Sequence, residues 1–152
     1  MDAIDLRILA ELQQNAQVSM AQLAEKVGLS TTPCWRRVQS LEKSGVIRQR
    51  VTLLDRDQLN VGVDVFVSIR TRRHNVDWLK DFAQSTAQFP EVVEFYRMSG
   101  EVDYLLRVVV PDIAAYDAFY KRLIEHEDIN DISSSFAMET IKYTTALPLN
   151  YV

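Results

Sequence analysis

The apolar residues of this 152-residue chain recur with two different periods, and the change of period divides the chain into two modules. Up to Gly45 they recur about every three to four residues, as on the buried face of a helix. From Val63 to Ile69 they alternate with other residues, which is typical of a strand. We therefore expect a helical module over residues 1–54, a polar linker over 55–62 and a mixed module over 63–152.

Three short helices are predicted in the first module. Asp2, Ser19 and Ser30 each precede a run with helical spacing, and all three are residue types that cap helix N-termini. Gly28 and Gly45 follow the second and third runs, where a left-handed residue commonly ends a helix. Because only a short turn at Gly28 separates the second helix from the third, the pattern is typical of a helix-turn-helix.

The third predicted helix has a buried stripe and a polar face. Cys34, Val38 and Leu41 follow one another at i, i+4 and i+7, so we expect them in the core. Cys34 is also the single cysteine of the chain, which excludes an internal disulfide. The opposite face combines hydroxyls, an amide and two cations without a carboxylate, at Thr32, Arg36, Gln39, Ser40 and Lys43.

Such a helix fits the major groove of double-stranded DNA, where Arg and Gln read base edges and Ser, Thr and Lys hold phosphates. Residues 1–54 carry seven Lys and Arg against five Asp and Glu, whereas the rest of the chain carries ten against sixteen. A strand predicted over residues 46–54 would add a basic wing. A solvated surface explains the same face without DNA. The DNA-binding candidates are Thr31, Thr32, Arg36, Arg37, Gln39, Ser40, Lys43, Arg48 and Arg50.

The second module has the element order βαββαβ, which is the split βαβ of ferredoxin-like domains. The fold class is therefore α+β, a winged helix-turn-helix followed by a ferredoxin-like domain. Such a sheet has helices on one face and leaves the other face for a second copy of the chain. Strands are predicted over 63–70, 92–98, 104–110 and 132–145, and helices over 76–88 and from 111 onward.

Enzyme chemistry finds little support in the residues. The two histidines, His74 and His126, lack the spacing of metal ligands beside cysteines or carboxylates. Glu101 and Asp103 flank a turn that contains no histidine, lysine or phosphate-binding glycine loop. We expect no catalysis, no metal and no cofactor. An acidic N-terminus without a signal-peptide pattern, and the lack of a membrane-spanning apolar run, predict a cytoplasmic protein.

The turn around Gly100 offers what a zwitterionic amino acid needs. The glycine allows close backbone approach, its neighbours supply N–H groups, and Asp103 supplies a carboxylate for an ammonium group. The run Ser133-Ser134-Ser135 adds small hydroxyl donors. A tight hairpin turn beside a solvated strand accounts for the same residues without a ligand, and by themselves the residues favour this second interpretation slightly.

Several motifs resemble the Lrp/AsnC family, the feast/famine regulators. Residues 29–38 and 41–47, Leu-Ser-Thr-Thr-Pro-Cys-Trp-Arg-Arg-Val and Leu-Glu-Lys-Ser-Gly-Val-Ile, are similar to the family's recognition helix and wing. Residues 97–106 resemble its effector-domain turn, Gly-x-x-Asp-Tyr. Residues 134–139 and 144–149 are also similar to family members, so the resemblance spans essentially the whole chain.

The resemblance implies a sequence-specific DNA-binding transcriptional regulator. It also implies homodimers that assemble further, commonly to octamers, with a small amino acid bound between dimers. Val102 stands where an aromatic residue is common and Ile132 where a threonine is, which leaves the identity of the amino acid open. Carried over by position, the effector site is lined by Ser99, Gly100, Glu101, Asp103 and Ser134.

Two other functions are compatible with parts of the pattern. One is an enzyme of amino-acid metabolism with a regulatory domain, which would turn over an amino acid. The other is a winged helix that binds a protein partner and never contacts DNA. Salt dependence of DNA association distinguishes a DNA-binding protein from this last case, because phosphate contacts release counterions and make binding depend on salt.

Overall fold

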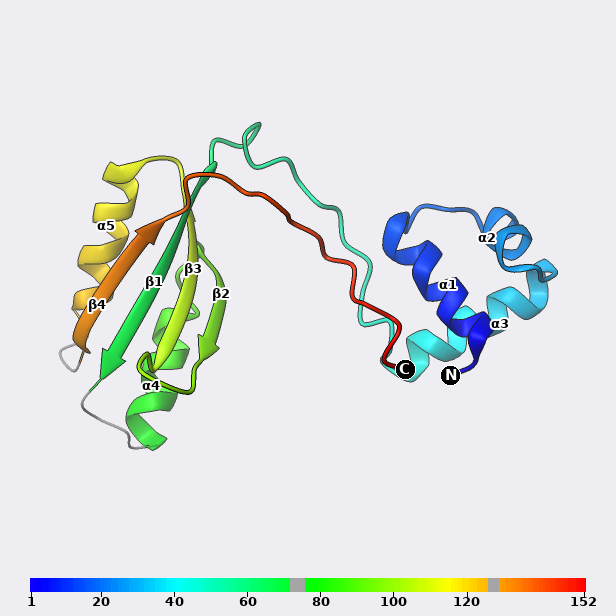
Figure 1. Cartoon of the computed structure of the whole chain (residues 1–152), viewed down its shortest axis with the longest axis horizontal. Helices are drawn as coiled ribbons and strands as arrows, with labels where there is room; N and C mark the ends of the chain where they lie inside the picture. The colour runs from blue at the N-terminus through cyan, green and yellow to red at the C-terminus, as the bar shows by residue number, and fades with distance from the viewer. Residues whose placement is uncertain (72–75, 126–128) are drawn as a thin grey trace. The chain divides into compact units, whose positions relative to one another are not determined.

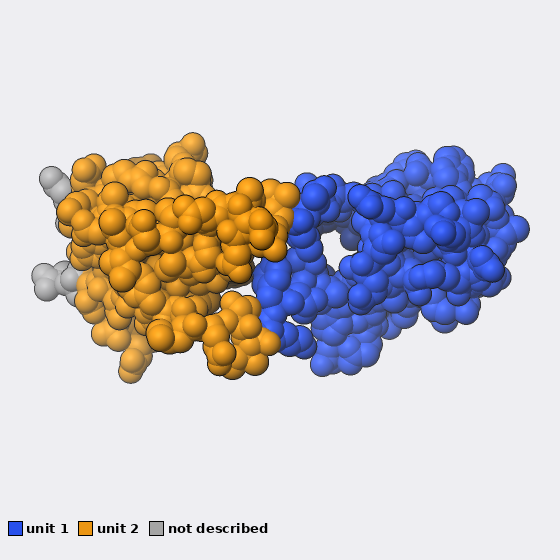
Figure 2. Space-filling model, turned by 90° about the horizontal axis from the view of Figure 1, so that it is seen from above, with its two compact units in different colours: residues 1–53, 142–152 blue, residues 54–141 orange. Residues whose placement is uncertain are grey.

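The structure is a computed structural model that describes residues 1–71, 76–125 and 129–152. Its internal contacts divide the chain into two compact units (Figure 2). The first unit comprises residues 1–53 together with 142–152, and the second comprises residues 54–141. Each unit buries a core of its own. His74 and His126 lie outside the described residues.

The first unit contains three helices, α1 (Ala3–Gln14), α2 (Met20–Val27) and α3 (Thr31–Lys43). The local signals in the sequence explain where they begin and end. Asp2 accepts hydrogen bonds from the N–H groups of Ile4 and Asp5, and Ser19 accepts one from Gln22. Gly28 ends α2 with a φ of +73°, and Gly45 follows α3 with a φ of +79°.

The predicted stripe of α3 lies in the core of the first unit. Cys34, Val38 and Leu41 are buried and belong to one cluster with Ile8 of α1 and Leu23 of α2. Burial raises the pKa of the Cys34 thiol, which suits a packing role rather than a nucleophile. The helix-turn-helix expected from the sequence is thus confirmed as three helices around one apolar core.

The strand expected over residues 46–54 is absent, although the structure describes all of these residues. Only Ile47 packs against the core, and its N–H donates to Leu41 O. A strand needs a ladder partner for its backbone groups, and this segment pairs with none of the strands that the structure describes. Arg48 and Arg50 therefore lie on an irregular segment and not on a strand.

The second unit has the predicted order βαββαβ (Figure 1). Its four strands form one antiparallel sheet in the order β2-β3-β1-β4. The elements are β1 (Val63–Thr71), α4 (Val76–Thr86), β2 (Val92–Arg97), β3 (Tyr104–Val110), α5 (Ile113–Ile124) and β4 (Ile129–Phe136).

The two faces of this sheet differ in burial. Val65 and Val67 of β1 are fully buried against Phe82 of α4 and Phe119 of α5, so both helices cover the same face. Phe66 points to the other face and is 40% exposed. The alternation of period two therefore separates a core face from an open face, as the sequence pattern predicts.

The last strand is shorter than the sequence suggested. It ends at Phe136 instead of continuing to Thr145, because its partner β1 begins at Val63 and the register pairs Phe136 with Val65. A last bond runs from Ala137 N–H to Asp64 O, beyond which β1 offers no backbone partner. Residues 142–152 then belong to the first unit. Among the described residues no helix is long and apolar enough to cross a membrane.

Candidate functional site

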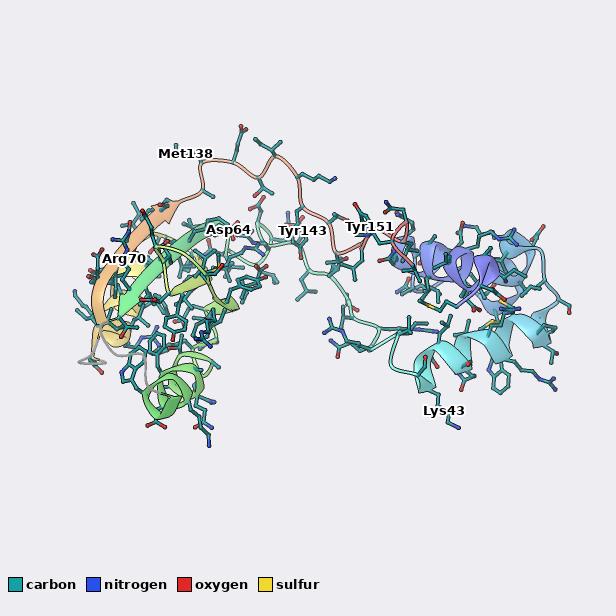
Figure 3. The ribbon with its side chains drawn as sticks, turned by 60° about the horizontal axis from the view of Figure 1, so that its bottom comes forward. Lys43, Asp64, Arg70, Met138, Tyr143 and Tyr151 are labelled. Carbon is teal, nitrogen blue, oxygen red and sulfur yellow. The ribbon has the colours of Figure 1, made fainter. Side chains whose placement is uncertain are left out.

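The face of α3 opposite its buried stripe is exposed over its whole length. Trp35 is 50% exposed, and Figure 3 shows Lys43 pointing away from the helices of the first unit. The helix therefore presents a polar ridge that no part of the first unit covers. Of the residues predicted to contact DNA, the exposed ones on this helix are Thr31, Thr32, Arg36, Gln39, Ser40 and Lys43.

Three of the predicted DNA-binding cations are available for phosphate or base contacts. Within the part of the chain that the structure describes, no carboxylate forms an ion pair with Arg36, Lys43 or Arg48. An unpaired exposed cation keeps its full attraction for a polyanion. The exposed face of α3 and the segment after it therefore carry three cations that pair with no carboxylate among the described residues.

The carboxylate of Glu42 binds two other predicted DNA-binding residues, Gln39 and Arg50. Its Oε2 accepts a hydrogen bond from Gln39 Nε2 at 2.9 Å, and its Oε1 pairs with Arg50 Nη2 at 2.9 Å. Both contacts are exposed, so solvent screens them and each contributes little to stability. In the single chain, Gln39 and Arg50 thus have Glu42 as a partner, unlike Arg36, Lys43 and Arg48 among the described ion pairs.

Arg37 is directed away from the exposed ridge. Its Nη1 lies 2.7 Å from Asp2 Oδ2 and 2.8 Å from Asp5 Oδ1, both at the N-terminal end of α1. Hydrogen bonds to Asp5 and then to Asp2 raise the pKa of Arg37 above its ordinary value. The sequence placed Arg37 with the DNA-binding cations, whereas the structure brings it together with two carboxylates that helical periodicity does not reveal.

The first turn of α3 leaves backbone donors for an anion. Ser30 precedes the helix as predicted, but its side chain makes no capping hydrogen bond. The hydroxyls of Thr31 and Thr32 lie exposed at the same end. Unsatisfied N–H groups and the helix dipole together favour a phosphate at such a terminus.

The turn after β2 is fixed to the end of β1 through Asp103. Its Oδ2 accepts a hydrogen bond from Thr71 N–H at 2.8 Å, and its N–H donates to Ile69 O at 3.0 Å. Met98 N–H donates to Asp103 O at 2.8 Å and closes the turn. Gly100 has a φ of +113°, a conformation that favours glycine. Asp103 thus attaches the turn to the end of β1, a contact called the latch below, and it is also a candidate partner for an ammonium group.

The neighbours of Gly100 are open to solvent. Ser99 and Glu101 are exposed, and Glu101 Oε2 lies 3.5 Å from Arg70 Nη2. The Glu101 side chain is 92% exposed, so the ion pair with Arg70 restrains the orientation of Glu101 only weakly. Four of the five predicted effector residues, Ser99, Gly100, Glu101 and Asp103, therefore lie together at one end of the sheet.

Ser134 lies apart from that turn within one chain. It pairs with Val67, four residues from Thr71 along β1, which corresponds to about 13 Å. Its Oγ forms a short hydrogen bond with Tyr116 OH on the helix-covered face. Burial raises the pKa of Tyr116, and the bond to Ser134 opposes that rise. The structure therefore does not bring Ser134 together with the other four predicted effector residues within one chain.

A charged network on the open sheet face was not predicted from the sequence. Asp64 is almost buried and contacts Arg56 Nη1 at 2.5 Å and Arg107 Nε at 2.9 Å. Arg107 Nη1 also pairs with Glu94 Oε1 at 2.8 Å. The available signal was Asp64, the single acidic residue of β1. Among the described residues no group of three or more His, Cys, Asp or Glu could hold a metal ion.

Two family descriptions match the chain. Residues 1–48 match "Winged helix-turn-helix DNA-binding", and residues 64–147 match "Lrp/AsnC ligand binding domain". The DNA-binding transcriptional activator DecR of Escherichia coli K12 is 47% identical over 150 residues, covering 98% of this chain and 99% of its own length.

Solved structures agree with these matches. An AsnC family transcriptional regulator from Agrobacterium tumefaciens is 65% identical, with a TM-score of 0.97 over 99% of both chains. A transcriptional regulator from Neisseria meningitidis in complex with L-methionine is 38% identical, with a TM-score of 0.95 over 99% of this chain and 98% of the other. All three proteins are transcriptional regulators, and DecR is a DNA-binding transcriptional activator.

Proposed function

The chain belongs to the Lrp/AsnC family of amino-acid-responsive, DNA-binding transcriptional regulators, and on that premise we propose which of its residues bind DNA and which bind the amino acid. In this proposal the DNA-binding domain comprises residues 1–54 and the linker residues 55–62. The domain that binds the effector and forms the oligomer comprises residues 63–152. Residues 142–152 additionally pack with the first unit. The protein acts in the cytoplasm, where its DNA target lies.

In this proposal α3 is the recognition helix. The observation that carries this assignment is its exposed face, on which Arg36 and Lys43 are free of carboxylates within the described residues. Arg36 lies at mid-helix and reads a base edge in the major groove, while Lys43 contacts phosphate. Thr31 and Thr32 hold a further phosphate at the helix N-terminus.

Of the two arginines predicted on the wing, we propose that only Arg48 contacts DNA without first leaving an ion pair. Arg48 is exposed and without an ion-pair partner in the described structure, so it contacts the DNA backbone directly. Gln39 and Arg50 contribute to DNA binding after their contacts with Glu42 are replaced by contacts with DNA. Ser40 lies between Arg36 and Lys43 on the exposed side and donates to phosphate.

The amino acid binds at the turn that contains Gly100. Backbone N–H groups beside Ser99 and Glu101 receive its carboxylate, and Asp103 receives its ammonium group. Because Ser134 lies about 13 Å along the sheet, we propose that it enters this site from a second chain. The Neisseria protein was solved with L-methionine, so methionine is the first effector to test.

A homodimer forms through the open face of the sheet, where Phe66 is 40% exposed and Tyr96 49%. Dimers then assemble further, and we propose an octamer. An effector bound between dimers changes the assembly or the DNA geometry through its different affinities for the two states. Light scattering with and without methionine measures the assembly size.

Binding to DNA from upstream of the protein's own gene tests this function. The full chain is titrated across a salt series with competitor DNA, with and without each member of an amino-acid panel. Saturable, salt-dependent binding that survives competitor supports the recognition role of α3. Binding that is absent or independent of salt would instead favour a winged helix that binds a protein partner.

A further inference from the structure

Arg37 is the only cation of the α3 segment whose guanidinium bridges to another helix among the described contacts. It is partly buried, with 33% of its side chain exposed, and Asp5 is less exposed still at 17%. The neighbouring Arg36 is exposed, and a step of about 100° around the helix separates the two side chains. The two adjacent arginines thus face different surroundings.

The carboxylates that hold Arg37 are themselves fixed. Asp2 Oδ1 accepts from the N–H groups of Ile4 and Asp5, which leaves Oδ2 for Arg37. Asp5 Oδ2 accepts from Asp2 N–H, which leaves Oδ1 for Arg37. Each carboxylate therefore uses one oxygen to cap α1 and the other to bind the guanidinium.

This arrangement adds direction to a contact that is otherwise apolar. Ile8 and Leu9 of α1 pack against Cys34 and Val38 of α3, and apolar packing by itself has little directional preference. A charge-assisted bridge with defined donor and acceptor atoms restrains rotation and sliding of α3 relative to α1. The bridge lies at the N-terminal end of α1, one residue after Arg36 along α3.

We infer that Arg37 is a positioning residue for DNA recognition: it stays paired with Asp2 and Asp5 when DNA binds and holds α3 in the orientation that presents Arg36. This inference rests on the proposed role of α3 as the recognition helix. It assigns a function to the first turn of α1, which lies outside the recognition helix. It also removes Arg37 from the residues that contact phosphate.

The two possible roles of Arg37 predict opposite effects when its acidic partners are neutralised. If Arg37 binds phosphate, Asp2 and Asp5 compete with DNA, and removing their charges strengthens binding. If Arg37 positions α3, removing those charges weakens specific binding even though the protein becomes less negative. The sign of the change therefore separates the two roles.

The decisive variant is Asp2→Asn with Asp5→Asn in the full chain. Asparagine keeps an acceptor oxygen for capping, so α1 retains its N-terminal hydrogen bonds while the charges are lost. We expect about tenfold weaker binding to the specific site, little change for competitor DNA, and an unchanged salt slope. Equal or tighter specific binding overturns the inference.

Arg37→Gln is the second variant. If Arg37 is a positioning residue, this variant leaves the slope of log affinity against log salt unchanged. If Arg37 contacts a phosphate, its loss lowers that slope by about one. Adding Arg37→Gln to the asparagine pair should weaken specific binding no further, because both changes break the same bridge. A lower slope or additive losses would contradict the inference.

Glu11→Gln is the matched control. Glu11 is also an α1 carboxylate paired with a cation, but its partner is Lys26 of α2 at 2.5 Å. Its neutralisation reports the general electrostatic gain without touching the bridge. Failure of the wild-type chain to bind DNA specifically would contradict the proposed function, whereas failure confined to the expected variant effects contradicts only the role of Arg37.

Discussion

The side-chain amide of Gln13 forms a reciprocal pair of hydrogen bonds with the backbone of Leu147. Gln13 Nε2 donates to Leu147 O at 3.2 Å, and Gln13 Oε1 accepts from Leu147 N–H at 2.6 Å. Two residues later, Leu149 packs against the apolar core of the first unit. The last residues of the chain therefore complete the fold of the helical unit that begins it.

Leu149→Ala should destabilise the first unit by about 1–2 kcal/mol, because the side chain is only partly buried. The expected result is faster hydrogen exchange in α1 and α3, measured by mass spectrometry on the full chain, with the sheet unaffected. Leu147→Ala is the matched control, since its side chain is 72% exposed while its backbone makes the contacts. Equal effects of the two variants would contradict a packing role for Leu149.

Arg36→Ala should weaken binding to the specific DNA site by about 1–3 kcal/mol and relax base preference at one position. A bidentate contact from Arg36 to a guanine is the physical reason. Competition between the specific site and single-base variants measures the effect. Lys43→Ala serves for comparison, because loss of a phosphate contact weakens all sequences alike and lowers the salt slope by about one. Unchanged base preference in the Arg36 variant would exclude it from base reading.

Glu42→Gln should strengthen DNA binding severalfold at low salt. The change frees Arg50 and removes a carboxylate beside the exposed face of α3. The gain should shrink as salt rises, since these charges are screened. Fluorescence anisotropy over a salt series measures it, with Glu25→Gln on α2 as a control carboxylate. Weaker binding would mean that Glu42 positions Gln39 and Arg50 for DNA.

The pH dependence of the first unit should reflect Asp2. Its pKa lies below the ordinary value of 3.8, first because Asp5 N–H donates to it and next because Arg37 does. A lowered folded-state pKa stabilises the fold above the unfolded value, and this contribution is lost as pH falls through the lowered value. Thermal melts between neutral and acid pH should show a weaker acid dependence for Asp2→Asn than for wild type. Parallel curves would contradict this linkage.

The starts of α1 and α2, the glycine ends of α2 and α3, and the order of helices and strands along the chain could be predicted because they depend on local signals. Ser19 caps α2 through Gln22, and Gly28 adopts a left-handed conformation, both within a few residues. Likewise the alternation around Phe66 distinguishes the two faces of β1 without knowledge of its partners. Capping and periodicity are properties of neighbouring residues, so one sequence reveals them.

Contacts between distant segments could not be predicted in this way. Gln13 and Leu147 are 134 residues apart, and no period connects them. Arg37 is adjacent to Arg36 in the chain, so composition groups the two. Only the packing of α1 against α3 brings Arg37, and not Arg36, to Asp2 and Asp5. The strand expected over residues 46–54 failed for the same reason, because a ladder depends on a partner that local β-propensity does not supply.

Replacing Asp103 separates its two roles at the effector turn. Asp103→Asn keeps an oxygen that accepts from Thr71 N–H but loses the charge that would bind an ammonium group. Asp103→Ala loses both. If the carboxylate binds the effector, both variants lose the response to methionine or to the amino acid identified in its place, and DNA binding without effector stays near wild type. Titration of the amino acid against the DNA-binding curve measures this. If only the alanine variant loses the response, the latch to β1 and not the charge is what the effector site requires, and the ammonium-binding role is wrong.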